Sequence, residues 1–477
     1  MTVRTAPTSA SQAGFFTRSL RRFGALLITL SGITPAASVF IMGQDVVRQA
    51  GTGALACFAV AALVSLATAF VYAELASAFP LTGGEYSIIG HALGPAWGLM
   101  ILGLNLAGGA LGQAVFALGL ADYLGVAVPG LPALPVALAA TLGTTLVTLL
   151  NIRLNAVVTG AFLLVELLAL GALTGLGLAE PHRSLAEAAF HPMMAVSGAL
   201  GPTPAAALGL GAAAAIFVFN GYGGAVFFGE EMYEARTRMA WVVFWSLAVA
   251  VVASTLPVAA VMTGARDLAA ILAAERPLAA FLADTGGPLI QKAVSLGVAF
   301  AIVNAMIAVG LINARQLYCS GRDRVWPGPV NRWVGAIHPR FGSPWVATLI
   351  MGALTAAACL LSLDLLVMLT ASGIVVVYAG VSVAALAGRR NGRTAAAGYR
   401  MPLFPLAPAI SLLALAAVVA ANVADPDVGR PGLIANGAVM ALFGGYYFLY
   451  LRRRGGFALR GADGLPLEAL EAEGLGK

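Results

Sequence analysis

Long apolar runs alternate along the chain with short segments that carry most of its charged residues. Because a helix needs about 20 apolar residues to cross a bilayer, each run predicts one membrane-spanning helix. The runs lie at 24–43, 54–79, 94–121, 132–151, 156–178, 205–229, 239–263, 288–315, 344–362, 364–387, 403–423 and 430–450. The pattern predicts an all-α integral membrane protein with about twelve transmembrane helices.

Composition agrees with the pattern and narrows the class of protein. Of the 477 residues 60% are hydrophobic and 10% charged, against about 45–50% and about 25% in soluble domains. A disordered chain and a water-soluble enzyme are therefore excluded. Three cysteines and four histidines are scattered without metal-ligand spacing, so neither a metal nor a cofactor is expected. The net charge of +6 does not predict a nucleic-acid partner, because the positions of the charges matter more than their sum.

The positions of the 27 basic residues predict how the chain is oriented. They concentrate before the first span, after the last, and in alternate connections, and such segments stay in the cytoplasm. Both termini are therefore predicted to be cytoplasmic. Only two of these residues are lysine, a bias typical of GC-rich bacterial genomes, which favours a bacterial inner membrane. The expected domains are a cytoplasmic segment 1–23, a twelve-helix domain 24–450 and a cytoplasmic tail 451–477.

Two of the predicted helices contain helix-breaking residues near mid-membrane. The first contains Ser-Gly-Ile-Thr-Pro-Ala-Ala-Ser at 31–38, and the sixth contains Phe-Asn-Gly-Tyr-Gly-Gly at 219–224. Proline removes a backbone donor and glycine weakens a helix, so both should unwind there. Five spans separate them, which predicts two inverted repeats, about 24–178 and 205–387, with helices 11 and 12 (about 403–450) outside.

Broken helices in a membrane offer backbone amides and carbonyls to a ligand. Half-helix amino ends favour a carboxylate, and freed carbonyls can accept from an ammonium group, so the pair suits a zwitterion. Ordinary packing kinks are the alternative explanation for a single break. Two breaks at repeat-related positions favour the binding site.

Three motifs resemble those of amino acid/polyamine/organocation permeases. They are the stretch 72–94 with its Pro-Leu-Thr-Gly-Gly-Glu-Tyr core, Gly-Glu-Glu at 229–231, and Gly-Arg-Asp-Arg-Val-Trp-Pro at 321–327. The resemblance implies the leucine-transporter-like fold and an amino acid substrate carried by alternating access. It also implies that helices 1, 2, 6 and 7 move against a scaffold that includes helices 3, 4, 8 and 9.

The same resemblance assigns the substrate site to the two breaks. Backbone amides of the first break would bind the substrate carboxylate, carbonyls near Ile33 and Phe219 its amino group, and Tyr222 would cover it. The site residues are Ile33, Thr34, Ala36, Ala37, Ser38, Phe219, Asn220, Tyr222 and Gly223. Many members carry Gly-Phe-Glu where this chain has Gly-Tyr-Gly at 221–223, and without that fixed negative charge a polyamine is the less favoured substrate.

Glu166 is the candidate for ion coupling, because it is the only acid well inside helix 5. It lies about 15 Å along the helix, near mid-membrane, where an ionisable residue is a functional candidate by default. A buried carboxyl group can bind and release a proton; a structural, protonated glutamate and plain exchange are the alternatives. The middle of helix 8, at 300–306, lacks a Ser/Thr pair, and so few oxygens disfavour sodium.

Further polar residues have weaker assignments. Asn105 and Gln113 of helix 3 either face the substrate or pack between helices. Glu74, Glu85, Glu230 and Glu231, near Arg236 and Arg322, are expected to form an ion network at an inner gate. A non-transporting sensor would need a long signalling extension and a membrane-embedded enzyme a catalytic constellation, and the sequence has neither.

Overall fold

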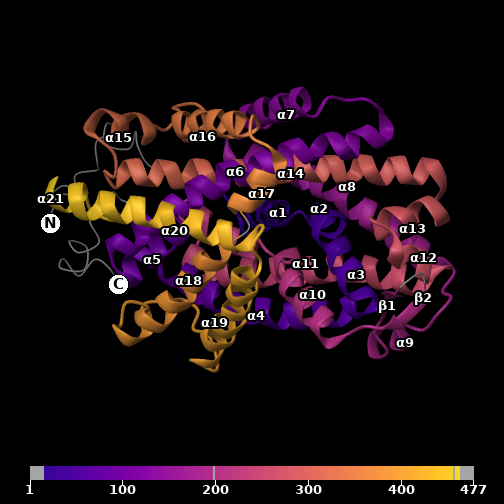
Figure 1. The fold of residues 1–477 in the computed structure, drawn as a ribbon. Helices are drawn as coiled ribbons and strands as arrows, with labels where there is room; N and C mark the ends of the chain where they lie inside the picture. The colour runs from indigo at the N-terminus through magenta and orange to yellow at the C-terminus, as the bar shows by residue number, and fades with distance from the viewer. Residues whose placement is uncertain (1–15, 197–198, 371, 455–456, 462–477) are drawn as a thin grey trace, which may run out of the picture.

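Long helices share a common axis in the computed structural model, which describes residues 16–196, 199–370, 372–454 and 457–461 (Figure 1). The predicted segments 1–23 and 451–477 lie partly outside these residues. The longest helices are α4 (Ala54–Ala78), α6 (Pro95–Ala127), α8 (Ile152–Ala179), α11 (Ala235–Gly264) and α14 (Gly287–Arg322). Within the described ranges nine helical segments are long and apolar enough to span a membrane, and Arg22–Ala78 covers two predicted spans. The all-α membrane architecture is confirmed.

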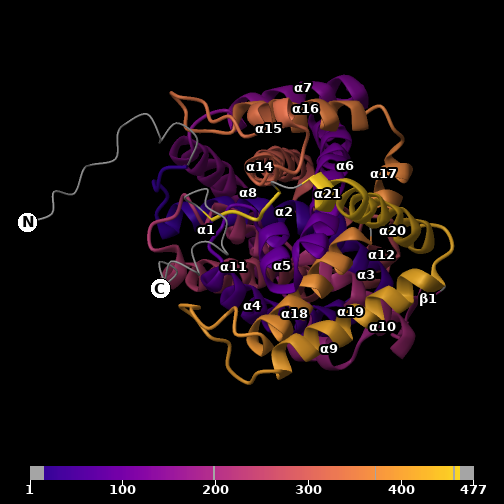
Figure 2. The ribbon, with the colours of Figure 1, turned by 90° about the vertical axis from the view of Figure 1, so that its left-hand side faces the viewer.

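Helix α14 forms the centre of the bundle. Seen along the axis, α1 (Arg22–Ile33), α6 and α8 surround it (Figure 2), and all three pack against it. The shorter apolar helices α7 (Ala133–Thr148) and α16 (Trp345–Ala358) cover its other side.

Of the residues in the most apolar part of Pro277–Arg322, which includes α14, 67% are buried inside the protein. In the corresponding part of Gly429–Arg454, at the edge of the bundle, only 17% are buried. The helices α18 (Gly373–Arg390), α19 (Leu406–Ala424) and α20 (Gly429–Tyr446) lie farther out. Large apolar side chains are exposed on several sides of the bundle, among them Leu142 of α7, Leu168 of α8 and Leu442 of α20, which suits contact with lipid.

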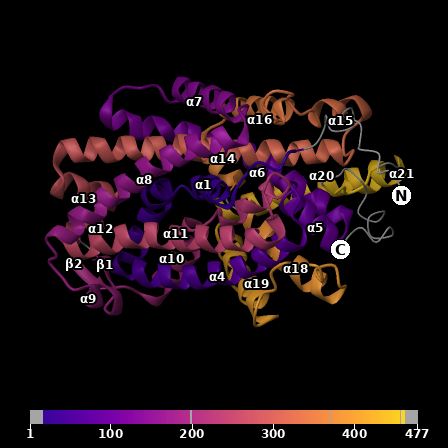
Figure 3. The ribbon, with the colours of Figure 1, turned by 180° about the vertical axis from the view of Figure 1, so that it is seen from behind.

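The two ends of the bundle differ. One end, called here the terminal end, carries α5 (Glu85–Leu93), α15 (Gly328–Val334) and α21 (Arg452–Arg454) (Figure 1). The opposite hairpin end carries α9 (Leu185–Phe190), α12 (Leu268–Ala273), α13 (Pro277–Thr285) and an antiparallel hairpin (Figure 3). Strands β1 (Met193–Val196) and β2 (Ala199–Pro202) pair Met193 with Pro202. The sequence did not predict this hairpin, because its strands are short and follow no clear alternation.

Two helix boundaries differ from the prediction. Helix α14 continues to Arg322, whereas the sequence placed the end of the span near residue 315 and a loop at 321–327. The arginines of its last turns are compatible with a buried helix because they have acidic partners, described below. The predicted tenth span is two helices, α17 (Leu363–Thr370) and α18, and the hydroxyl of Ser372 between them donates to the Gly429 carbonyl.

Candidate substrate site at two broken helices

The first predicted break is present at Thr34. Helix α1 ends there because the residue before a proline avoids the right-handed helical region and Pro35 has no N–H to donate. Thr34 adopts φ 46° and ψ 71°, a left-handed conformation that costs a β-branched residue about 1–3 kcal/mol. The chain then continues as α2 (Pro35–Ala37), a π-helical turn η1 (Ser38–Gly43) and α3 (Gln44–Ala50).

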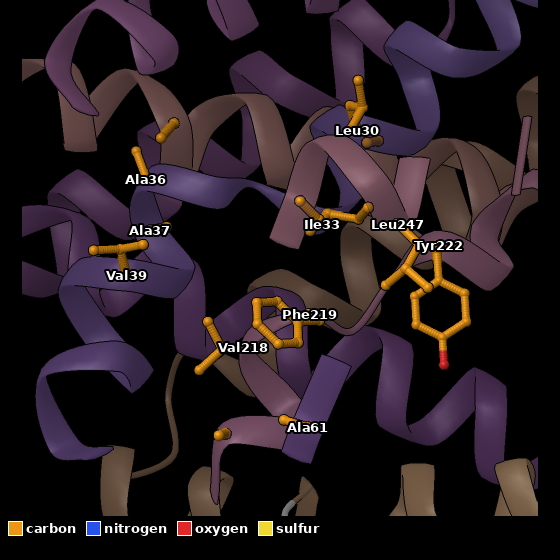
Figure 4. Packing of buried hydrophobic residues seen from close by; sticks show 14 of the residues in the cluster. Leu30, Ile33, Ala36, Ala37, Val39, Ala61, Val218, Phe219, Tyr222 and Leu247 are labelled. Atoms are coloured by element: carbon orange, nitrogen blue, oxygen red, sulfur yellow. The ribbon is translucent and has the colours of Figure 1, made fainter. Parts of the chain in front are cut away.

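The second predicted break adjoins the first. Helix α10 (Ala205–Val218) stops before Phe219, and a 3₁₀ helix η3 (Tyr222–Phe228) follows. Gly221 between them has φ 116°, which favours glycine. A Cβ at Gly221 would lie 3.0 Å from the Cα of Ile33. Figure 4 shows Ile33 and Ala36 of the first break together with Phe219 and Tyr222 of the second. The two discontinuities therefore lie next to each other in the bundle.

Glu166 reaches this site from α8. Its Oε2 lies 3.4 Å from the Thr34 hydroxyl, and its Oε1 accepts a 2.9 Å hydrogen bond from Nδ2 of Asn304 on α14. The backbone amide of Ala36 also donates to this carboxyl group. Glu166 is fully buried, and the salt bridges among described residues do not include it. The buried Glu166 carboxyl group thus contacts only uncharged donors, at the point where helix α1 is broken.

The protein itself satisfies several polar groups of the first break. The hydroxyl of Ser38 donates to the Ile33 carbonyl at 2.9 Å, and its amide donates to the Thr34 carbonyl at 2.9 Å. The Thr34 hydroxyl lies 3.2 Å from the carbonyl of Ala301. Ala36 and Ala37 are fully buried. A ligand could therefore bind to these groups only if it replaced hydrogen bonds that the protein now makes with itself.

Aromatic side chains close the second break. Tyr222 is buried, with its ring centroid 6.1 Å from that of Tyr72 and 6.3 Å from that of Tyr378. The Tyr378 hydroxyl donates to Oδ1 of Asn220. A Cβ on Gly223 would lie 2.6 Å from the Tyr72 ring, so a side chain there needs Tyr72 to move.

Beside Asn220 and Tyr378 lies a small cavity, which α10, α18 and α19 line with apolar side chains. Its volume is about 10 Å³, close to the space that one water molecule needs. The buried Phe219 packs on the other side of this break, with its ring centroid 5.8 Å from that of Phe58. The surroundings of the second break are therefore tightly packed.

The two polar residues of α6 have different partners. Gln113 donates to the Met306 carbonyl at 2.8 Å and lies 3.4 Å from the Thr355 hydroxyl, which joins α6 to α14 and α16. Asn105 donates to Oε2 of Glu85 at 3.1 Å. Gln113 is thus an interhelical packing group in this structure, whereas Asn105 faces an acid.

Three ion pairs, two of them between buried side chains and one with a partly exposed arginine, lie at the terminal end. Each joins an acid that the sequence singled out to an arginine, and the N–O distances run from 2.5 to 2.9 Å. The pairs are Glu231–Arg315, Glu230–Arg322 and Glu74–Arg389. Arg322, one of the two arginines that the sequence placed near these acids, is the partner of Glu230. The salt bridges of the described residues include neither Arg236, the other arginine, nor Glu85.

Segments from both chain ends cover the ion pairs. The amides of Ser19 and Leu20 donate to the Glu231 carbonyl at 2.8 Å. Asp323 accepts from the Tyr86 hydroxyl at 2.8 Å and from the Arg460 amide at 3.2 Å. Burial raises the pKa of Asp323 to about 6, although Arg322 beside it acts in the opposite direction. Residues 19–20 and Arg460 therefore pack over the ion pairs of the terminal end.

The hairpin end is more open. A cavity of about 50 Å³ lies there, between η1, α3, the last turn of α6, α13 and α14. Its polar lining includes Gln44, Asp122, Arg276 and Gln291. Asp122 and Arg276 are both more than half exposed and lie 3.8 Å apart. The structure is thus closed at the terminal end and hollowed at the hairpin end.

The long apolar helices are those of a multi-pass membrane protein. The chain belongs to the amino acid permease family, whose model matches residues 20–443. It is a transporter of this family and not an enzyme.

Relatives with known or assigned transport roles cover most of the chain. The branched-chain amino acid permease BcaP of Bacillus subtilis is 26% identical over 83% of this chain and 87% of its own length. The methylthioribose transporter of the same organism is 24% identical over 85% and 88%. An uncharacterized transporter of Mycobacterium tuberculosis is 29% identical over 71% and 73%.

Proposed function

We propose that the protein is a secondary active transporter that moves amino acids across a bacterial inner membrane by alternating access, with the proton as coupling ion. In this proposal twelve spans form two inverted repeats plus helices 11 and 12, and the terminal end faces the cytoplasm. The observation that carries the coupling is the position of the Glu166 carboxyl group, which meets the Thr34 hydroxyl and the Ala36 amide at the broken helix.

The position of Glu166 links proton binding to substrate binding. A substrate carboxylate bound to the amides of the first break would lie close to the Glu166 carboxyl group. Two negative charges in a water-poor site repel strongly, so the substrate binds best when Glu166 carries a proton. Loss of that proton inside the cell returns the repulsion and favours release. Occupation of the site by substrate and proton together is the basis of symport.

The lining of the breaks supports an uncharged substrate side chain. Ile33, Phe219 and Tyr222 are buried apolar or aromatic groups, and position 223 lacks a carboxylate. A small apolar amino acid therefore fits better than a polyamine. An organic amine is the second substrate class, and uncoupled exchange of amino acids is the alternative mechanism. A substrate sensor without transport activity is the remaining possibility.

Proteoliposomes test this function directly. Purified protein is assayed with radiolabelled amino acids, amines and methylthioribose, with and without an inward proton gradient. Accumulation of amino acids only under the gradient supports the proposal, and gradient-independent equilibration makes the protein an exchanger. Accumulation driven by sodium alone would contradict proton coupling, and amine uptake alone would contradict the substrate class.

Glu166→Gln tests the coupling residue. It preserves the shape of the side chain but cannot release a proton, so gradient-driven accumulation should fall to the equilibrium level while counterflow exchange continues. Glu180→Gln is the matched control, because Glu180 caps the same helix, is exposed and pairs with Arg266. If Glu166→Gln accumulates substrate as the control does, Glu166 is structural.

A further inference from the structure

Glu85 is a buried acid at the terminal end, and the salt bridges among the described residues give it no cationic partner. Only 7% of its surface is exposed, and it begins α5, outside the predicted spans. Its Oε1 accepts from the Tyr72 hydroxyl at 3.0 Å and its Oε2 from Asn105 at 3.1 Å. Four other acids at this end, Glu74, Glu230, Glu231 and Asp323, each have an arginine within 4 Å.

The groups that face Glu85 are uncharged. They are Tyr72 of α4, Asn105 of α6, Tyr378 of α18 and, behind Tyr72, Tyr222 of η3. The arginines of α18 are in its last turn, where Arg389 binds Glu74. On α5 itself, burial lowers the pKa of His91 to about 4, so this side chain is neutral near pH 7. Burial raises the pKa of Glu85 to about 7, although its two donors act in the opposite direction.

A short chain of contacts connects Glu85 with the second break. Tyr72, which donates to Glu85, has its ring centroid 5.5 Å from that of Tyr378. The hydroxyl of Tyr378 in turn donates to Asn220 between α10 and η3. Glu85 therefore lies two tyrosines from the break where the substrate is proposed to bind.

We propose that Glu85 is a second proton-binding residue of the transport cycle, which acts as a positioning residue on the Asn220 break through Tyr72 and Tyr378. This inference rests on the proposed transport function. In the closed form Oε1 accepts from Tyr72 and Oε2 accepts from Asn105, and a proton on the carboxyl group removes the charge that burial penalises. When that proton leaves to water at the terminal end, a buried anion without a cation remains. Its need for hydration favours separation of Glu85 from Tyr72 and opening of that end.

Melting of the purified protein tests the titration of Glu85 without any transport. The folded pKa of about 7 lies above the ordinary 4.5, so folding strengthens proton binding. The stability that this contributes is complete below pH 4.5 and is lost as the pH rises through about 7. Wild type and Glu85→Gln are compared between about pH 5 and pH 9. All three cysteines are buried, so a thiol-reactive dye reports unfolding.

The melting comparison has two decisive outcomes. If Glu85 titrates, wild type should lose stability relative to Glu85→Gln as the pH rises through neutrality. Asp323 is present in both proteins, so its contribution to the pH dependence of stability cancels in the difference between them. A purely structural role of Glu85 would give a difference in melting temperature that is the same at every pH, and this result would overturn the inference. Glu180→Gln should follow wild type throughout.

Counterflow exchange tests the link to the break. In proteoliposomes without a gradient, the pH profile of exchange should flatten in Glu85→Gln. Tyr72→Phe keeps the carboxyl group but removes its link, so its melting should stay pH-dependent while its exchange profile flattens. An unchanged profile in both variants would overturn the inference. If wild type carries none of the substrates, the proposed function fails, and the melting comparison still decides whether Glu85 titrates.

Discussion

Glu231 and Glu166 are buried to a similar degree, yet their surroundings differ in kind. Glu231 holds Arg315 by two hydrogen bonds of 2.5 and 2.9 Å, and both side chains are at most 3% exposed. Glu166 meets only hydroxyl and amide donors. The charge of Arg315 balances that of Glu231, and removal of either side chain would leave the other charge buried without a partner. A carboxyl group among neutral donors can gain or lose a proton, which is the property that transport requires.

Removal of Arg315 should give the largest effect of this comparison. Arg315→Met leaves the Glu231 charge buried without a partner, which should destabilise the protein by about 3–5 kcal/mol. Its melting temperature should fall well below that of wild type. Glu231→Gln in the Arg315→Met background removes the stranded charge and should recover most of the loss. Wild-type melting by Arg315→Met alone would show that the pair does not hold the terminal end closed.

The positions of the helices were largely predictable, and so were their breaks. Apolar runs must lie in lipid or in the core, and Thr34-Pro35 and Gly221 interrupt a helix for local steric reasons. These features depend on residues close together in the sequence. For this reason the structure confirms both discontinuities at the residues where the sequence placed them.

The partners of the buried acids were not predictable. Glu231 and Arg315 are 84 positions apart, and Glu74 and Arg389 are 315 apart. Hydropathy carries no signal for such pairs, and of the two arginines that the sequence named only Arg322 belongs to one of them. Only the packing of the helices shows that the neighbouring acids pair with arginines and that Glu85 does not. The one available signal was Arg315, a charge at the end of a predicted span, which suggests a buried acid opposite.

A substitution of Asn304 tests the uncharged surroundings of Glu166. Asn304→Ala removes the 2.9 Å donor to Glu166, which should cost about 1–3 kcal/mol if the carboxyl group is charged and less if it is protonated. Proton-driven accumulation should fall, because the carboxyl group loses its fixed orientation. A double-mutant cycle with Glu166→Gln separates this contact from general damage. Equal stability losses in both backgrounds would mean that the two side chains do not interact.

A substitution of Glu180 should have the smallest effect, although its 2.8 Å contact with Arg266 is about as short as the contacts of the three ion pairs at the terminal end. Both side chains are more than half exposed, so water and salt screen the attraction and either charge is solvated without the other. Glu180→Gln should therefore leave the melting temperature and accumulation unchanged, at low and at high salt. A clear loss of stability that disappears in salt would mean that distance rather than burial sets the strength of these pairs. In that case the distinction between Glu231 and Glu166 would need another physical basis.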